Sequence, residues 1–163
     1  MIEQQVQLPN TQNKTRIMIV DDHPIVRRGL VLLINQEADL AVTAEAENAE
    51  QALDGIGKQH FDLAIVDISL SGTNGVELTE TIKTKYPNLP VLILTMHDEA
   101  RYARSAFCAG ARGYVTKRDA AETIVSAIRL VRSGKNYVSD NMARKLSEST
   151  VPACKTAKSD EAE

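Results

Sequence analysis

The sequence contains no tryptophan and only two cysteines, Cys108 and Cys154. Two cysteines supply neither the disulfide framework of a small secreted protein nor the four ligands of a structural zinc site, so we expect two reduced thiols. We expect Cys108 to pack beneath a helix and Cys154 to be exposed in a polar tail. The lack of tryptophan also means that tryptophan fluorescence cannot report ligand binding.

The sequence also has no excess of positive charge. It contains 19 Lys and Arg residues and 22 Asp and Glu residues, which gives a net charge of −3. That balance argues against nucleic-acid binding through general basicity and against polybasic membrane attachment. No apolar stretch has the length of a transmembrane helix, and residues 1–14 contain no apolar run typical of a signal peptide. We therefore expect a cytoplasmic protein without a membrane partner, and its 163 residues suit one domain of ordinary size.

Short apolar runs are the clearest feature that the sequence does contain. Three of them are continuous and not alternating, as in parallel strands that are covered by helices on both sides. A fourth run is weaker, and a fifth is less apolar and is typical of an edge strand. In that order, the runs lie at residues 17–20, 63–66, 91–94, 113–116 and 40–46.

Segments with apolar residues at helical spacing separate these runs. Pro87 and Gly134 end two of these segments, whereas Gly29 weakens the helical pattern of the first. Strands and helices therefore alternate from residue 15 to residue 133, which predicts an α/β fold with a doubly wound parallel sheet. The apolar residues that should share a helix face are Ile25, Val26, Leu30 and Leu33, then Leu78, Ile82 and Tyr86, and finally Ile124, Ile128 and Val131.

The pattern changes after Gly134. Ser139 could cap a short helix that runs to Leu146, and residues 147–163 are polar and rich in small side chains, as in a linker. We therefore divide the chain into a disordered segment at 1–14, one domain at 15–134, and a short helix with a linker-like tail at 135–163.

Polar side chains follow the predicted strands at the carboxyl edge of the sheet, where ligands bind in open α/β folds. Asp21 and Asp22 could simply begin a helix, and one acid could form a structural ion pair with Lys117. Asp67 follows a buried strand, and three converging acids would repel one another unless a cation such as Mg²⁺ neutralised them. Lys117 and Thr95 could then contact a phosphoryl group, with an aspartate as its acceptor.

These residues fall in an ordered set of motifs that resembles the receiver domain of two-component response regulators, specifically the NarL/FixJ type. The resemblance covers roughly residues 15 to 134. The motifs are Val20-Asp21-Asp22-His23-Pro24, Asp67 followed by Gly72 and Gly75, Leu94-Thr95, and the segment Gly-Ala-Arg-Gly-Tyr-Val-Thr-Lys from Gly110 to Lys117. The resemblance implies a flavodoxin-like (CheY-like) sheet of five strands in the order 2-1-3-4-5, with helices on both faces. Residues 40–46 and 113–116 would be the two edge strands.

The resemblance also implies that Asp67 accepts a phosphoryl group from a sensor histidine kinase and becomes an aspartyl phosphate. Asp22 and Asp67 would hold Mg²⁺ directly, together with the backbone carbonyl of Ser69. Asp21 would act on the ion through a bound water. The domain would be a phosphoprotein switch and not an enzyme with turnover.

Thr95 and Lys117 match the hydroxyl and the lysine with which the family senses the phosphoryl group, and Tyr114 matches its aromatic switch residue. The fourth helix, fifth strand and fifth helix would form an output surface for partner docking or a phosphorylation-dependent homodimer. Two positions depart from the family pattern. Ser71 and Arg118 stand where many receivers have proline, which affects the turns at those positions.

The NarL/FixJ resemblance implies transcription regulation through a C-terminal helix-turn-helix domain, which residues 147–163 are too short to contain. DNA would be bound only through that domain, and the alternative is a stand-alone receiver that acts through protein contacts. A magnesium-dependent phosphohydrolase of the haloacid dehalogenase type is a weaker alternative, because it needs a second acid where Ser69 stands. An FMN-binding flavodoxin is a further alternative, but Asp21 and Asp22 would repel the cofactor's phosphate unless a cation intervened.

Overall fold

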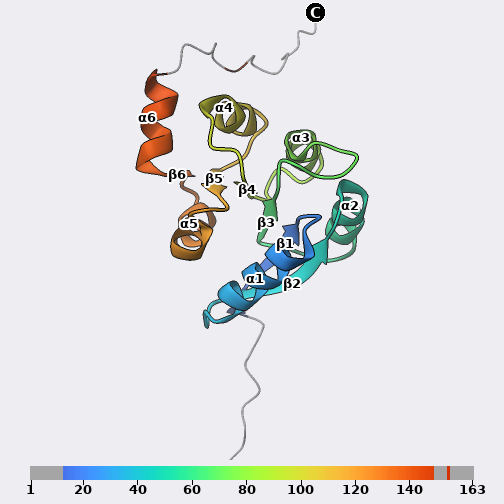
Figure 1. Ribbon diagram of the computed structural model, residues 1–163. Helices are drawn as coiled ribbons and strands as arrows, with labels where there is room; N and C mark the ends of the chain where they lie inside the picture. The colour runs from blue at the N-terminus through green and yellow to red at the C-terminus, as the bar shows by residue number, and fades with distance from the viewer. Residues whose placement is uncertain (1–12, 149–153, 155–163) are drawn as a thin grey trace, which may run out of the picture.

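The chain is described by a computed structural model, which covers residues 13–148 and Cys154. The predicted disorder at 1–14 and the predicted tail beyond 148 therefore fall almost entirely outside the described residues. Helices and strands alternate along the chain (Figure 1). In chain order they are β1 (Thr15–Val20), α1 (Pro24–Asn35), β2 (Leu40–Ala46), α2 (Ala49–Lys58), β3 (Leu63–Val66), α3 (Gly75–Lys85), β4 (Val91–Thr95), α4 (Ala100–Cys108), β5 (Gly113–Thr116), α5 (Ala120–Arg132), β6 (Tyr137–Val138) and α6 (Asp140–Glu148).

The strands form one parallel sheet in the order β2-β1-β3-β4-β5-β6. The α/β class, the parallel sheet and the order 2-1-3-4-5 are confirmed, and β2 is an edge strand as expected. The prediction of five strands is wrong, because β6 adds a sixth beside β5. Its residues Tyr137 and Val138 pair with Gly113 and Tyr114, so β5 is not the second edge. Two residues are too few to show a strand pattern in the sequence.

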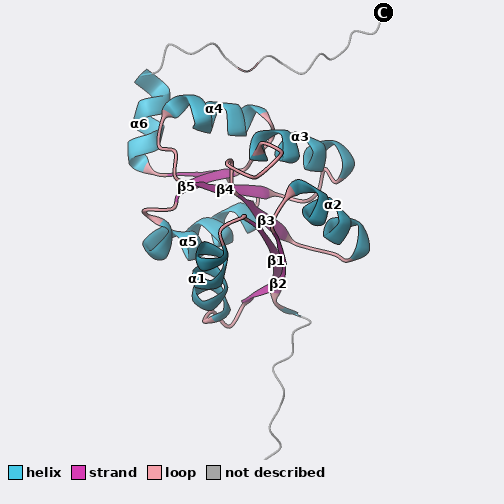
Figure 2. Cartoon of the chain, turned by 45° about the vertical axis from the view of Figure 1, so that its right-hand side comes forward, coloured by secondary structure: helices cyan, strands magenta, loops and turns pink. Residues whose placement is uncertain are grey.

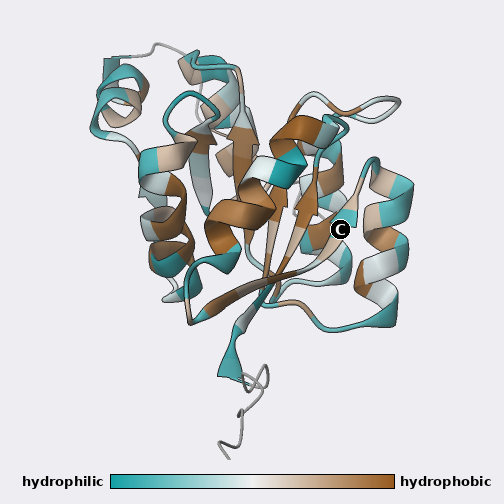
Figure 3. Ribbon diagram, turned by 60° about the horizontal axis from the view of Figure 1, so that its bottom comes forward, coloured by the Kyte–Doolittle hydropathy of each residue, from teal (hydrophilic) through white to brown (hydrophobic). Residues whose placement is uncertain are grey.

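Helices cover both faces of the sheet, as predicted (Figure 2). Alternate residues of β1 point to opposite faces: Ile17 and Ile19 join the core beneath α1 and α5, whereas Met18 and Val20 join the core beneath α2, α3 and α4. Figure 3 shows that the strands between these layers are largely hydrophobic. At the carboxyl ends of the strands, the chain leaves this apolar layer and enters polar loops.

Local chemistry explains where some of the helices begin and end. Asn74 caps α3 by accepting a hydrogen bond from the backbone N–H of Val76 at 2.7 Å. After α5, Gly134 has φ of 95°, a conformation that favours glycine at a helix end. The predicted apolar face of α1 is partly wrong, because Ile25 is 87% exposed, whereas Leu30 and Ile34 are buried. The inward face is therefore shifted toward Ile34, which the sequence pattern did not single out.

The expectation of two reduced thiols is wrong in this structure, because Cys108 and Cys154 form a disulfide. Cys108 is the last residue of α4 and is exposed, so it does not pack beneath that helix. The two cysteines are 46 residues apart in sequence, and no local pattern predicts that residue 154 lies beside α4. None of the described helices has the length and apolar content needed to cross a bilayer.

Candidate phosphoacceptor site

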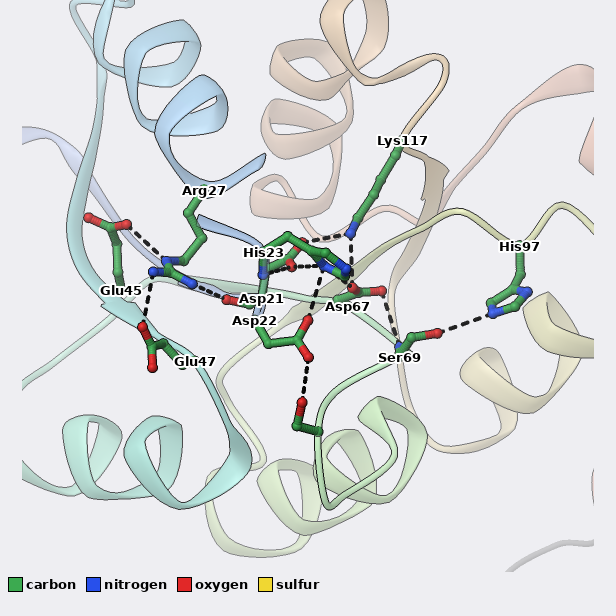
Figure 4. Close-up of polar contacts among 11 residues, drawn as sticks. Asp21, Asp22, His23, Arg27, Glu45, Glu47, Asp67, Ser69, His97 and Lys117 are labelled. Atoms are coloured by element: carbon green, nitrogen blue, oxygen red, sulfur yellow. Dashed lines mark hydrogen bonds and ion pairs between the residues drawn. The ribbon is translucent and has the colours of Figure 1, made fainter. Parts of the chain in front are cut away.

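The carboxyl ends of β1, β3 and β5 bring Asp21, Asp22, Asp67 and Lys117 to one edge of the sheet (Figure 4). Thr95 is the last residue of β4. Val20, the last residue of β1, pairs with Val66, the last residue of β3. Asp21 and Asp67 directly follow these two residues and therefore lie side by side. The backbone N–H of Asp67 donates to the carbonyl of Val20 at 3.0 Å, which fixes this arrangement. On the other side, the N–H of Lys117 donates to the carbonyl of Thr95 at 2.8 Å.

Lys117 forms ion pairs with two buried carboxylates. Its Nζ lies 2.8 Å from Oδ2 of Asp21 and 2.9 Å from Oδ2 of Asp67, and both aspartates are 2% exposed. Burial raises the pKa of Asp67 above its ordinary value, although the hydrogen bond from Lys117 opposes this effect. Burial alone would lower the pKa of Lys117, but the hydrogen bonds to Asp21 and Asp67 raise it. Lys117 is therefore the positive charge of the site.

Asp22 is less buried and has a different partner. Its Oδ2 accepts a hydrogen bond from the Ser71 hydroxyl at 2.7 Å, and this bond is the main reason that the pKa of Asp22 is lowered. The sequence predicted an altered turn at Ser71 but did not predict this contact. The other carboxylate oxygen of Asp22, Oδ1, is shielded from solvent and makes no hydrogen bond, and the Nδ1 of His23 lies 3.0 Å from it. This oxygen could bind a cation if the His23 imidazole moved away from it.

His23 lies at the centre of the acidic cluster, whereas the sequence placed it only in the motif that follows the first strand. It is the N-cap residue of α1, but its side chain does not cap the helix. Its Nδ1 lies 2.7 Å from Asp21 Oδ1, 3.0 Å from Asp22 Oδ1 and 3.8 Å from Asp67 Oδ2. The imidazole thus contacts the same carboxylates as a bound cation would.

Arg27 is a second residue that sequence reasoning missed. Its guanidinium donates to the backbone carbonyl of Asp21 at 2.6 Å and forms ion pairs with Glu45 and Glu47. The only available signal was its position one turn after His23. Arg27 thereby fixes the backbone of Asp21 against the β2 side of the sheet.

The acidic cluster has the chemistry of a site for a hard cation. One ligand atom from each of Asp21, Asp22, His23 and Asp67 lies within 4.8 Å of the others. Carboxylate oxygens are the protein ligands that Mg²⁺ prefers, and the Asp22 oxygen that lacks a hydrogen bond supports such a role. Ser69 follows in the loop after β3, and its N–H donates to Asp67 Oδ1 at 3.2 Å.

The two predicted switch residues lie on β4 and β5 and are linked through His97. Thr95 is fully buried, and its Oγ1 accepts a hydrogen bond from the N–H of His97 at 3.3 Å. Tyr114 is also buried, and its hydroxyl donates to the carbonyl of His97 at 2.6 Å. Burial raises the pKa of Tyr114, so the phenol is protonated. The structure brings Asp21, Asp22, Asp67 and Lys117 into one cluster. Tyr114 contacts the loop between β4 and α4 through His97.

The imidazole of His97 connects this loop to the phosphoacceptor side. Its Nε2 lies 3.1 Å from the Ser69 hydroxyl, and its ring stacks on Tyr102 of α4 with centroids 4.3 Å apart. The loop between β4 and α4 therefore contacts the loop after Asp67, the buried tyrosine and the first turn of α4. The sequence did not predict these contacts of His97.

Comparison with known proteins identifies the family. The family model described as the response regulator receiver domain matches residues 17–129. The transcriptional regulatory protein DegU of Brevibacillus brevis is 32% identical over 135 residues, which cover 83% of this chain and 57% of DegU. The response regulator UvrY of Escherichia coli K12 is 31% identical over 140 residues, which cover 86% of this chain and 64% of UvrY. The chain thus spans less than two thirds of the length of either curated relative.

Solved structures agree with this result. A LuxR-family two-component response regulator from Aurantimonas sp. SI85-9A1 superposes with a TM-score of 0.80 at 38% identity, covering 83% of this chain and 96% of that one. The isolated receiver domain of RcsB from Salmonella enterica serovar Typhimurium, solved with the phosphomimetic BeF3⁻, gives a TM-score of 0.76 at 26% identity, covering 82% and 99%. The fold is thus the CheY-like receiver fold, and the chain belongs to the response regulator receiver domain family.

Proposed function

We propose that Asp67 accepts a phosphoryl group from the phosphohistidine of a sensor histidine kinase in a Mg²⁺-dependent reaction. The observation that carries this proposal is the position of Asp67, a buried carboxylate at a strand end, beside both Lys117 and two further acids. A structural ion pair would need one acid for one lysine. The additional carboxylates would instead bind a cation.

Asp22 and Asp67 would hold Mg²⁺ directly, together with the backbone carbonyl of Ser69, and Asp21 would act through a water. The bound ion would supply positive charge to the phosphoryl oxygens. Oδ1 of Asp22 is buried without a hydrogen bond, which supports the assignment of Asp22 as a ligand. His23 Nδ1 contacts the same oxygens, so the imidazole would have to turn away when the ion binds.

In the transfer step, a carboxylate oxygen of Asp67 attacks the phosphorus of the donor. The new oxygen–phosphorus bond forms as the phosphorus–nitrogen bond of the phosphohistidine breaks, and the nitrogen keeps the bonding electrons. Lys117, now 2.9 Å from the carboxylate, would pair with a phosphoryl oxygen as a point charge. Thr95 would donate its hydroxyl to another phosphoryl oxygen.

The hydrogen bonds of His97 support the role of Thr95 and Tyr114 as switch residues. A shift of Thr95 toward the phosphoryl group would weaken the hydrogen bond that its Oγ1 accepts from His97. The carbonyl of His97 also accepts the hydrogen bond of the Tyr114 hydroxyl. The loop between β4 and α4, Tyr114 and α4 would therefore adjust together. The surface of α4, β5 and α5 would transmit the change to a partner or to a second copy of the chain.

The domain would act as a switch in the cytoplasm and not as an enzyme with turnover, with at most slow self-dephosphorylation. Its output would be the control of transcription through a helix-turn-helix domain outside this chain. Two observations on relatives support that output: DegU is a transcriptional regulatory protein, and RcsB dimers have been solved bound to DNA. A stand-alone receiver that acts through protein contacts is the second candidate.

The test is the intact mass of the chain after incubation with acetyl phosphate, with and without Mg²⁺. We expect the wild type to gain one phosphoryl group only with Mg²⁺, and Asp67→Asn to gain none. Asp54→Asn is the matched control, because Asp54 is an exposed carboxylate on α2 whose partner is Lys58. Phosphorylation of Asp67→Asn, or its absence from the wild type even with a cognate kinase, would contradict the proposal.

A further inference from the structure

The short helix α6 packs beside α4, on the side of the sheet that also carries α2 and α3 (Figures 1 and 2). Met142 is buried in the same core cluster as Ala103 and Ala106 of α4, and Leu146 packs against that cluster. Ser139 begins the helix, because its hydroxyl accepts a hydrogen bond from the N–H of Met142 at 3.1 Å. α6 thus covers part of α4.

Two hydrogen bonds hold the C-terminal half of α6, one to α4 and one to the loop before it. The guanidinium of Arg104 donates to the carbonyl of Leu146 at 3.0 Å. The Nζ of Lys145 donates to the carbonyl of Asp98, just before α4, also at 3.0 Å. These contacts are few, and a nine-residue helix is too short to be stable without packing. Without a further constraint, α6 would leave α4 at modest cost.

The disulfide between Cys108 and Cys154 supplies that constraint. Cys108 ends α4, Cys154 follows α6 in the chain, and their Cα atoms are 5.3 Å apart. Both cysteines are exposed, so small thiols and disulfides can reach them. They are the only two cysteines in the sequence, so no other intramolecular pair competes. Every residue of α6 lies inside the loop that the bond closes.

We propose that Cys108 and Cys154 form a reversible thiol–disulfide switch that locks α6 over α4 when it is oxidised. The oxidant would be a small-molecule disulfide such as glutathione disulfide. One cysteine thiolate attacks the small disulfide, forms a mixed disulfide and releases one small thiol. The second cysteine thiolate attacks the protein sulfur of that mixed disulfide, forms the Cys108–Cys154 bond and releases the second thiol. Two protein thiols are oxidised by two electrons as one small disulfide is reduced to two thiols.

Reduction by excess thiol reverses both steps and frees the chain after α6 from α4. Oxidation stabilises the packing of α6 on α4 through loop closure. The bond restricts the chain more when α6 has left α4 than when α6 is packed against it. α4 belongs to the output surface of the proposed function, so oxidation would also limit the access of partners to that surface. This last consequence rests on the proposed function, whereas the redox site itself does not.

The test is hydrogen–deuterium exchange on the full chain after equilibration with glutathione disulfide or with dithiothreitol. Peptide mapping without reductant should show the Cys108–Cys154 bond in the oxidised sample. We expect the amides of residues 140–148 to exchange about tenfold more slowly in the oxidised chain than in the reduced chain. The amides of β3 should show no difference.

Cys154→Ser and Cys108→Ser are the matched variants, and both should exchange at the reduced rate in either buffer. Both positions are exposed, so neither variant removes a core contact. Three outcomes would overturn the proposal: only intermolecular disulfides, only glutathione adducts, or equal exchange of residues 140–148 in the oxidised and reduced wild type. No phosphoryl donor is present, so failure here is distinct from failure of Asp67 as the acceptor.

Discussion

Lys117 reaches carboxylates from two strands, with its Nζ 2.8 Å from Asp21 and 2.9 Å from Asp67. Asp22 adds a third acid, and the Nδ1 of His23 lies among all three. The charge of the cluster is thus only partly balanced by the described residues around it. Single residues at this site therefore affect both the stability of the fold and the chemistry that we propose.

Asp67→Asn is expected to stabilise the metal-free fold at neutral pH. Burial raises the folded-state pKa of Asp67 above its ordinary value of 3.8. A group of this kind contributes its full stability below the unfolded-state pKa and loses it as the pH rises through the folded-state pKa. Asparagine cannot ionise, so the variant should gain about 1 kcal/mol in free energy of unfolding at neutral pH and nothing at pH values below the ordinary pKa.

Urea unfolding followed by far-UV circular dichroism across this pH range, with a chelator present, measures the difference. The control is Asp54→Asn on α2, whose carboxylate is exposed and should change stability little at any pH. A neutral-pH free energy of unfolding for Asp67→Asn equal to or below that of the wild type would show that the ion pair with Lys117 outweighs the cost of burial.

At the scale of elements, the start of α3 is fitted closely to the strand end that carries Asp67. The N–H of Gly75, the first residue of α3, donates to the carbonyl of Ile68 at 2.8 Å. A Cβ at Gly75 would overlap the backbone carbonyl of Asp67. Only glycine therefore allows the helix to approach the phosphoacceptor this closely.

Gly75→Ala is expected to lower the free energy of unfolding by about 2–3 kcal/mol and to reduce phosphorylation from acetyl phosphate, because the backbone of Asp67 must move. Gly29→Ala is the matched control within α1, where a Cβ meets no atom within 4 Å. That change should stabilise the chain by roughly 0.5–1 kcal/mol through helix propensity. Denaturant unfolding of both variants measures the contrast. Similar effects of the two substitutions would argue against a close fit at Gly75.

At the scale of the whole molecule, the sequence predicted what depends on pattern and missed what depends on distant contacts. Residues 63–66 form β3 as expected, because a continuous apolar run signals a strand covered on both sides. β6 was missed because its two residues pair only after α5 has returned the chain to β5. The Cys108–Cys154 bond was missed for the same reason.

The candidate site followed the same division. Asp21, Asp67 and Lys117 could be placed together, since the ends of parallel strands meet at one edge of a sheet. The central position of His23 and the Ser71–Asp22 hydrogen bond could not, because they depend on loop conformation. Loops carry no hydrophobic period from which their geometry could be read.

Mg²⁺ is expected to raise the melting temperature of the whole chain, because a ligand that binds only the folded state stabilises it. At a tenfold excess of Mg²⁺ over its dissociation constant the gain is about 1.4 kcal/mol, or roughly 5 °C. Scanning calorimetry is the suitable measurement, since the chain has no tryptophan. Asp22→Asn should show a smaller rise. Equal rises in the wild type and in Asp22→Asn would place the ion elsewhere.

The sixth strand also has a consequence for how the chain behaves in concentrated solution. A strand at the border of a sheet offers free N–H and C=O groups that can recruit a strand from another molecule. β6 occupies this position beside Gly113 and Tyr114 of β5. It is only two residues long, so it adds little free border of its own. The segment that follows α5 thereby protects the β5 side of the sheet from edge-to-edge aggregation.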